Sequence, residues 1–219
     1  LAPTGLDFAT DSTVYGVEYH TASDFMMDGL KMSFSASTDN GATKGATWKN
    51  DGHLALGATY VTDLGDSAVT LGGGYSEVGG SKGSGTAVVN DTGGFHVGLS
   101  AVTGDLTVAV GFADGHAAGV SDNGSDEYEG EVVKAGVKYV SGDITFNLGV
   151  LSSEAKDSDT FGTAGTTADS IDQTDASVSY AVAAGVTAIL GYSNTESQNE
   201  GSADSTDGSA WYIGANMSF

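Results

Sequence analysis

Apolar residues occupy every second position in eleven stretches of about eight to ten residues along this chain. The last stretch alternates from Trp211 to Phe219, with Tyr212, Gly214, Asn216 and Ser218 on the polar parity. Because successive side chains of a strand point to opposite faces, this pattern predicts strands with one apolar and one polar face. The expected strands span about residues 12–21, 30–38, 53–62, 67–77, 94–103, 105–113, 131–141, 143–152, 175–184, 186–194 and 210–219.

The connections between these strands alternate in length. Tight links rich in Gly and Asp are expected at 63–66, 103–105, 141–143 and 184–185, with a somewhat longer one at 23–29. Long polar loops, which hold most of the acids, are expected at 39–52, 78–93, 114–130, 153–174 and 195–209. A sheet with one plain and one elaborated end is typical of an antiparallel barrel in an outer membrane.

The apolar parity carries no charged residue, as expected of a surface that faces lipid. Its aromatic residues favour the strand ends. Tyr60, Tyr139 and Phe219 fall near short turns, and Tyr75, Phe95, Phe112, Tyr192 and Trp211 fall near long loops. Two such groups predict the two aromatic girdles of a membrane barrel. The alternative is a large soluble β-sandwich in which the apolar parity forms the core.

The amino-acid composition argues against several classes of protein. The 219 residues include 34 Gly, one Pro and no Cys, and seven basic residues, all Lys, face 29 acids, for a net charge of −22. Nucleic-acid binding needs clustered basic residues, so a nucleic acid is not an expected partner. Without Cys there is no disulfide or thiolate-metal scaffold. No run approaches the ~18 apolar residues of a transmembrane helix.

A family resemblance rests on the terminal strand at 210–219, the Tyr-Val-Ser-Gly-Asp hairpin at 139–143 and the acidic, Gly-rich loops. Together they resemble the general diffusion porins of Gram-negative bacteria, most closely the alphaproteobacterial type. The resemblance implies a 16-stranded, homotrimeric barrel that passes small hydrophilic solutes. It also implies contact with outer-membrane lipid and lipopolysaccharide, extracellular long loops, a periplasmic C-terminus, and Phe219 as the signal that the barrel-assembly machinery reads.

The strand number bears on closure. Outer-membrane barrels of this kind have an even number of strands, and an open edge in lipid leaves unpaired N–H and C=O groups. We therefore expect residues 1–219 to form a single barrel domain that supplies about eleven of sixteen strands. The N-terminal strands and the constriction loop would then lie outside this sequence.

Several charged or titratable residues fall on the polar parity and are expected to line a pore: Glu18, His20, Lys31, His53, His96, Lys134 and Lys138. Such residues set the field across a pore and tune its ion selectivity. Solvated wall residues without a particular role are the alternative. The other inward positions are mainly Gly, Ser and Thr, which leave space and favour a channel. We expect this channel to prefer cations. A surface adhesin or structural barrel that acts through its acidic loops is the competing function.

Other chemistry has little support in the sequence. Asp122, Asp126, Glu127 and Glu129 offer the oxygen ligands that Ca²⁺ prefers, but their spacing does not fit an EF-hand. A weak Ca²⁺ site or diffuse bridging of divalent ions to lipopolysaccharide phosphates stays open, and no other cofactor is expected. The four His residues lack a metal-ligand spacing and there is no Gly-x-Ser-x-Gly motif, so an enzyme is not expected.

Overall fold

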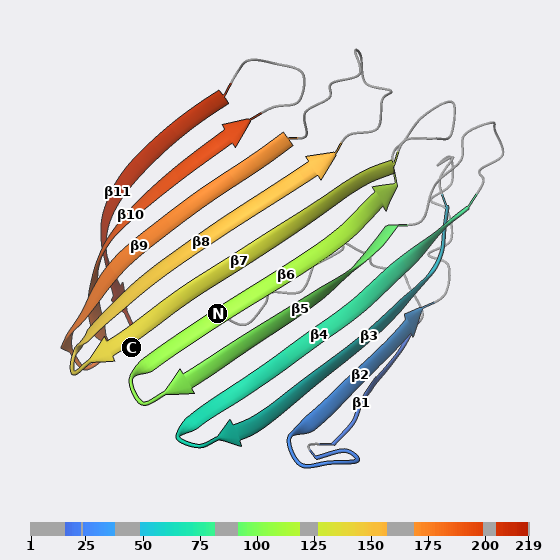
Figure 1. Cartoon of the computed structure of the whole chain (residues 1–219), viewed down its shortest axis with the longest axis horizontal. Helices are drawn as coiled ribbons and strands as arrows, with labels where there is room; N and C mark the ends of the chain where they lie inside the picture. The colour runs from blue at the N-terminus through green and yellow to red at the C-terminus, as the bar shows by residue number, and fades with distance from the viewer. Residues whose placement is uncertain are drawn as a thin grey trace.

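The computed structural model describes residues 16–22, 24–37, 49–81, 92–118, 127–156, 169–198 and 205–218. All regular structure in these ranges is β-strand: β1 (Gly16–His20), β2 (Leu30–Ser37), β3 (Lys49–Leu64), β4 (Ser67–Ser81), β5 (Thr92–Thr103), β6 (Leu106–Ala118), β7 (Glu127–Ser141), β8 (Ile144–Lys156), β9 (Asp169–Ala183), β10 (Val186–Gln198) and β11 (Ser205–Met217). They form one sheet in which each strand pairs antiparallel with the next along the chain (Figure 1). The predicted number and order of strands are confirmed.

The strands extend further toward the long connections than the sequence pattern predicts. β3 begins at Lys49 and β9 begins at Asp169, several residues before the predicted starts. Backbone pairing continues there, for example between Gln198 of β10 and Ser205 of β11. The prediction stopped short because these extensions are largely polar on both faces, so the alternation ends while the hydrogen-bonded ladder goes on.

Two-residue turns join several strands at the opposite end of the sheet. Gly65, Gly104 and Gly142 occupy the first turn position with φ of 63°, 54° and 59°. A type II′ hairpin turn needs a positive φ at this position, which glycine adopts without steric cost. Between β1 and β2 the connection is longer, and the carboxylate of Asp24 accepts a hydrogen bond from the Gly29 N–H at 2.7 Å. The predicted short connections are confirmed.

The apolar face of the sheet has no second layer over it in the described part of the chain. Large apolar side chains remain exposed along the strands; Val110 and Leu148, for example, are each 50% exposed. Ala109 is the one buried hydrophobic residue among the described positions. A soluble β-sandwich would bury this parity under a second sheet. The described residues do not form that alternative.

The apolar band crosses the strands diagonally. Its last residue on the loop side is Leu54 in β3 and Ala176 in β9. When paired residues are followed from strand to strand, Ala176 of β9 connects to Thr62 of β3. Thr62 lies eight residues beyond Leu54 along β3. With about 3.3 Å per residue and about 4.8 Å between strands, this offset over six strand spacings gives a tilt of roughly 40°. Strands of outer-membrane barrels tilt by about 35–45°.

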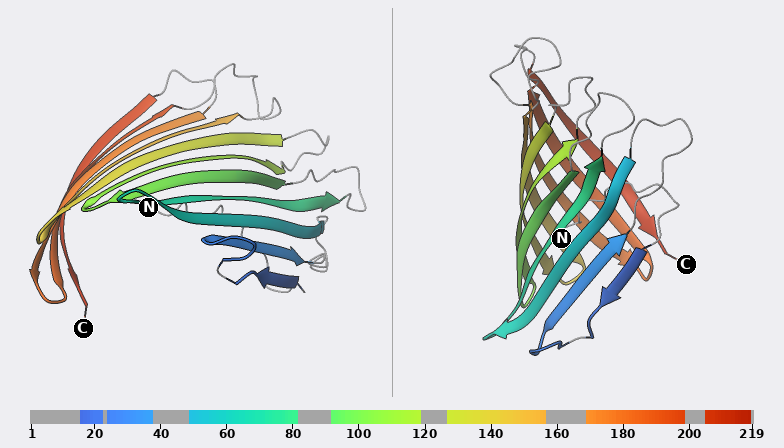
Figure 2. Two further views of the ribbon diagram at one scale, coloured as in Figure 1. Left: turned by 60° about the horizontal axis from the view of Figure 1, so that its bottom comes forward. Right: turned by 90° about the vertical axis from the view of Figure 1, so that its right-hand side faces the viewer.

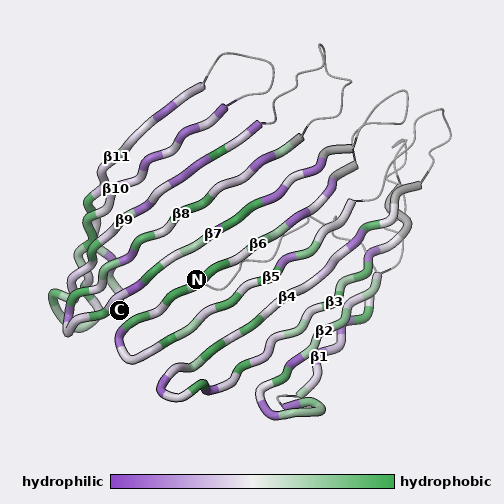
Figure 3. The backbone as a smooth tube through the Cα atoms, viewed as in Figure 1, coloured by the Kyte–Doolittle hydropathy of each residue, from purple (hydrophilic) through white to green (hydrophobic). Residues whose placement is uncertain are grey.

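Aromatic residues mark the loop-side edge of this band. The last large apolar outward residues of β4, β5, β6, β10 and β11 are Tyr75, Phe95, Phe112, Tyr192 and Trp211. The rings of Phe95 and Phe112 lie 5.7 Å apart, and those of Tyr192 and Trp211 lie 4.8 Å apart. Beyond them the outward positions turn polar, and much of the loop-side part of β8 to β10 is purple in Figure 3. The predicted position of these aromatic residues near the loop-side ends of the strands is confirmed.

The sheet curves but is open along two edges. Its strand order begins at β1 and ends at β11, and no described strand pairs with the outer edge of either. In Figure 2 the sheet bends like part of a barrel wall, with β1 and β11 lying apart. The inner, concave face of this wall carries the polar parity and holds the candidate site.

Candidate functional site: the concave wall

A hollow of about 720 Å³ lies on the concave face over β1 to β5. Because side chains alternate along each strand, every second residue of these strands points into it. β2 contributes a run of hydroxyl groups at Ser33, Ser35 and Ser37, which follow Lys31 on the same parity. The hollow is therefore lined mainly by hydroxyl, imidazole and charged groups, with bare backbone between them.

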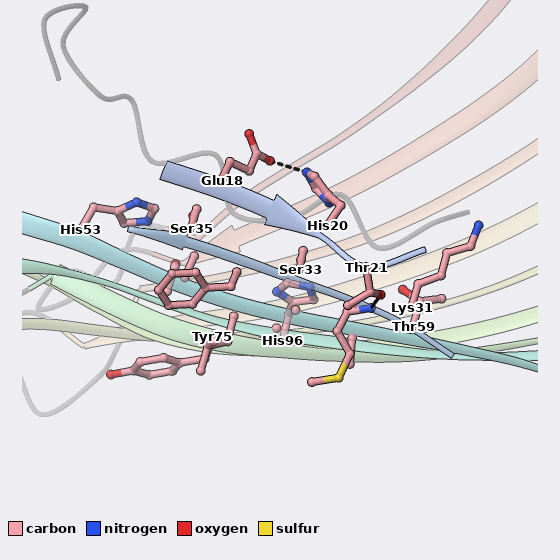
Figure 4. A pocket seen from close by; sticks show the side chains of 18 of the residues that line it. Glu18, His20, Thr21, Lys31, Ser33, Ser35, His53, Thr59, Tyr75 and His96 are labelled. Atoms are coloured by element: carbon pink, nitrogen blue, oxygen red, sulfur yellow. Dashed lines mark hydrogen bonds and ion pairs between the residues drawn. The ribbon is translucent and has the colours of Figure 1, made fainter. Parts of the chain in front are cut away.

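Five of the seven predicted wall residues meet in this hollow: Glu18, His20, Lys31, His53 and His96. They come from β1, β2, β3 and β5, and Figure 4 shows them around one space. Nε2 of His20 lies 2.7 Å from Oε1 of Glu18. The two side chains are 65% and 67% exposed, so solvent screens this contact and it adds little to stability. The contact with Glu18 instead positions the His20 imidazole at the rim of the hollow.

Two glycines clear the floor of the hollow. A Cβ at Gly74 would lie 2.8 Å from Cε1 of His96, and a Cβ at Gly57 would lie 2.7 Å from Oγ of Ser33. The imidazole and the hydroxyl thus occupy the space that larger residues on β3 and β4 would fill. Ser33, Ser35 and Ser37 were not among the predicted site residues, although their parity with Lys31 was a signal that could have identified them.

Lys134 and Lys138 do not line this hollow. They lie on β7, further along the same concave wall. Lys134 and Lys31 belong to one row of directly paired residues across the sheet. The residues between them in this row are Thr59, Gly72, Gly98 and Gly111. Three glycines therefore separate Thr59 from Lys134, and the wall between the two lysines is nearly free of side chains.

The far end of the wall is more filled. Asn147 lies opposite Lys138, and its amide donates a hydrogen bond to Oγ of Ser177 at 3.2 Å. On β11 the ring of Tyr212 lies over Gly191 of β10, where a Cβ would collide with it. The carboxylate of Asp175 accepts a hydrogen bond from the Gln173 amide at 2.8 Å.

Several acids lie in strands rather than in the predicted loops. Asp114, Glu131 and Glu154 stand directly opposite one another on β6, β7 and β8. A second row consists of Asp172, Glu196 and Asp207 on β9, β10 and β11. Of these six, all but Glu131 were assigned to loops, because their polar surroundings hid the strand. Like charges directly opposite across a sheet repel and are destabilising.

The predicted Ca²⁺ ligands and the terminal residue are largely beyond the described chain. Asp122, Asp126 and Phe219 lie outside the described residues, as does the side chain of Glu127. Glu129 is exposed on β7, opposite His116 of β6. In the described ranges, no group of three or more His, Cys, Asp or Glu residues could hold a metal ion. The same ranges contain no helix that is long and apolar enough to cross a bilayer.

Comparison with solved structures connects this wall to membrane barrels. OmpT, an outer membrane protein of Vibrio cholerae, is similar with a TM-score of 0.60 and 16% identity over 92% of this chain and 64% of that chain. Its loop-deletion variant OmpTdeltaL8 gives 0.57 and 17% over 92% and 62%. A porin gives 0.60 and 16% over 96% and 63%. No family model and no curated protein matches the sequence.

These likenesses show the fold. The chain has the all-β architecture of an outer-membrane β-barrel wall, as predicted. It spans less than two thirds of the length of the solved barrels that it resembles. At this level of identity the activity and the bacterial group of those proteins do not carry over.

Proposed function

We propose that this chain forms most of the wall of an outer-membrane porin, a water-filled channel for passive diffusion of ions and small hydrophilic solutes. The observation that carries the proposal is the pair of opposite faces on one tilted sheet. The outward face is apolar, uncharged within its band and edged by aromatic rings. The concave face is polar and largely free of bulky side chains. Lipid on one side and water on the other fit these two faces.

The channel requires that both open edges of the sheet find partners. Unpaired N–H and C=O groups in hydrocarbon cost several kcal/mol each. We propose that further strands close the barrel between β1 and β11, in line with the predicted sixteen-stranded domain. More than a third of each solved barrel lies outside the part that this chain matches, which leaves room for such strands.

We propose a preference for cations because of the many acidic residues outside the concave face, and not because of the charges on that face. On the concave parity of the described strands, four acids stand against Lys31, Lys134 and Lys138: Glu18, Asp63, Asp169 and Asp175. The net charge of −22 therefore acts from elsewhere, including the acid rows near the loop ends of β6 to β11. These rows share the outward parity, so their charge acts from outside the wall, where it raises the cation concentration around the loop-side end of the barrel.

The surroundings belong to the same proposal. The apolar band contacts outer-membrane lipid, and the acid rows lie at the depth of the lipopolysaccharide headgroups, with the long connections outside the cell. A homotrimer and delivery by the barrel-assembly machinery are proposed from the resemblance to porins. No catalytic role is proposed.

Planar bilayers provide the test. Full-length native polypeptide reconstituted in a bilayer should give steady, ohmic current with a reversal potential that indicates cation preference. A control variant with unchanged lipid face and a bulky residue in the wall, Gly98→Trp, should insert equally well and conduct less. Insertion without current in the unaltered protein would refute the channel and leave a surface role for the acidic end.

A further inference from the structure

The histidines of this chain are unevenly distributed. The sequence has four, and three of them, His20, His53 and His96, line the single hollow over β1 to β5. The fourth, His116, lies on β6 at an outward position, opposite Glu129 of β7. Histidine is the side chain whose ordinary titration falls between about pH 5 and pH 8. Protonation of three such groups on one surface would change its charge by three.

Few fixed charges accompany these imidazoles. β1 contributes Glu18, β2 contributes Lys31, and the inward positions of β3 within the hollow and of β4 and β5 contribute no charged residue besides the histidines. β6 contributes none on this face, and the next wall charges are Lys134 and Lys138 on β7. With neutral imidazoles the hollow is close to charge-balanced. With protonated imidazoles it carries an excess of three positive charges.

The imidazoles are placed where a solute would meet them. His20 stands at the rim with a 65% exposed side chain, and His96 lies over the bare backbone of Gly74. Hydroxyl groups of Ser33 and Ser35 lie beside them and can donate hydrogen bonds to an anion (Figure 4). The positive charges of the protonated wall and these donors would face the same space.

We propose that His20, His53 and His96 make this hollow a pH-dependent anion-recognition surface, which attracts small anions such as sulfate-like or carboxylate solutes when the imidazoles are protonated. The proposal rests on the proposed channel for its effect on ion flow, but the binding itself does not require a current. With neutral imidazoles the surface is nearly charge-balanced and leaves the channel's cation preference unopposed. Acidification lowers that preference from within the wall.

The size of the effect follows from simple electrostatics. Three charges at about 10 Å from an ion in water, screened over a Debye length of about 10 Å at ~0.1 M salt, change the local ion concentration about twofold. Cations are depleted and anions enriched, so the permeability ratio falls about fourfold. At ~0.01 M salt, where screening is weaker, the same change is about twentyfold.

The first experiment measures reversal potentials in planar bilayers at about pH 8 and about pH 5, in both salt concentrations. The variants are the triple substitution His20→Gln, His53→Gln and His96→Gln, and the matched single substitution His116→Gln. The native protein and the His116 variant should show the fall in cation preference with acid, larger at low salt. The triple variant should lose most of it. An equal pH response in the triple variant, or none in the native protein, overturns the proposal.

The second experiment separates this proposal from the channel itself. Sulfate, which stays doubly charged in this pH range, is titrated calorimetrically into detergent-solubilised full-length protein at both pH values. Tighter binding at about pH 5 that disappears in the triple variant supports the anion surface even if no current is seen. Binding that is independent of pH or of the three histidines overturns it, whether or not the protein conducts.

Discussion

Leu99 and Ser100 offer a direct test of which face of the sheet meets lipid. They are neighbours on β5, at a similar height on opposite faces. Leu99 lies between Leu71 and Val110 on the apolar face and is 44% exposed. Ser100 lies between Thr70 and Ala109 on the concave face. The substitutions Leu99→Lys and Ser100→Lys add the same charge at nearly the same depth.

A lysine on the lipid side near the middle of a bilayer costs about 2–4 kcal/mol in outer-membrane barrels. At about 1.4 kcal/mol per factor of ten, Leu99→Lys should shift the folding equilibrium in bilayers by roughly 30-fold to 1,000-fold. Ser100→Lys keeps its ammonium group in water, and we expect a change within about 0.5 kcal/mol. Urea titration of the full-length protein in phospholipid vesicles, followed by tryptophan fluorescence, measures both.

A different pair of results would contradict the assignment of the apolar face to lipid. If the apolar face met water or another protein layer, Leu99→Lys would cost little in vesicles, or both variants would cost the same. Equal free energies of unfolding for the two variants would therefore refute the assignment of the faces, and with it the channel. A larger loss of stability for Ser100→Lys than for Leu99→Lys would mean that the concave face, and not the apolar face, meets lipid.

Three further predictions test local features. Gly29→Ala should lower stability by more than 1 kcal/mol, since φ is +81° there and the new Cβ would meet the Val61 carbonyl, whereas Gly214→Ala, with open space around it, should cost far less in the same urea titration. Glu131→Gln should raise stability by about 0.2–1 kcal/mol, more at low salt, by removing like-charge repulsion in its row, and a salt-independent loss would contradict this. In a Trp48→Phe background, Trp211 fluorescence should be quenched best by lipids labelled near the headgroup; best quenching at the bilayer centre would remove it from the girdle.

The sequence alone predicted the strands because their apolar parity must face lipid without interruption. The same reasoning could not locate the loop-side ends of β3 and β9, where backbone pairing continues among polar side chains. Nor could it distinguish Glu154 or Asp172 in a strand from the same residue in a loop. Where both faces of a strand meet water, both parities are polar. Backbone hydrogen bonding then continues without any apolar–polar alternation in the sequence.

Inward residues were predicted by parity, but their grouping was not. Lys31, His53 and Lys134 satisfy the same alternation rule, yet only the first two share the hollow over β1 to β5. Grouping depends on register between strands, which the turns and long connections set. It depends also on absent side chains, since His96 reaches across β4 only because position 74 is glycine.

Glycine in the wall argues for an open interior over a filled one. Small barrels fill their centre with inward side chains. Here the line from Thr59 to Lys134 crosses Gly72, Gly98 and Gly111, none of which projects into the interior. Glycine weakens a strand by roughly 0.5–1 kcal/mol relative to alanine, so three in one line lower the stability of the sheet. The gain is space beside charged and hydroxyl groups, which a passage for water and ions needs and a packed core does not.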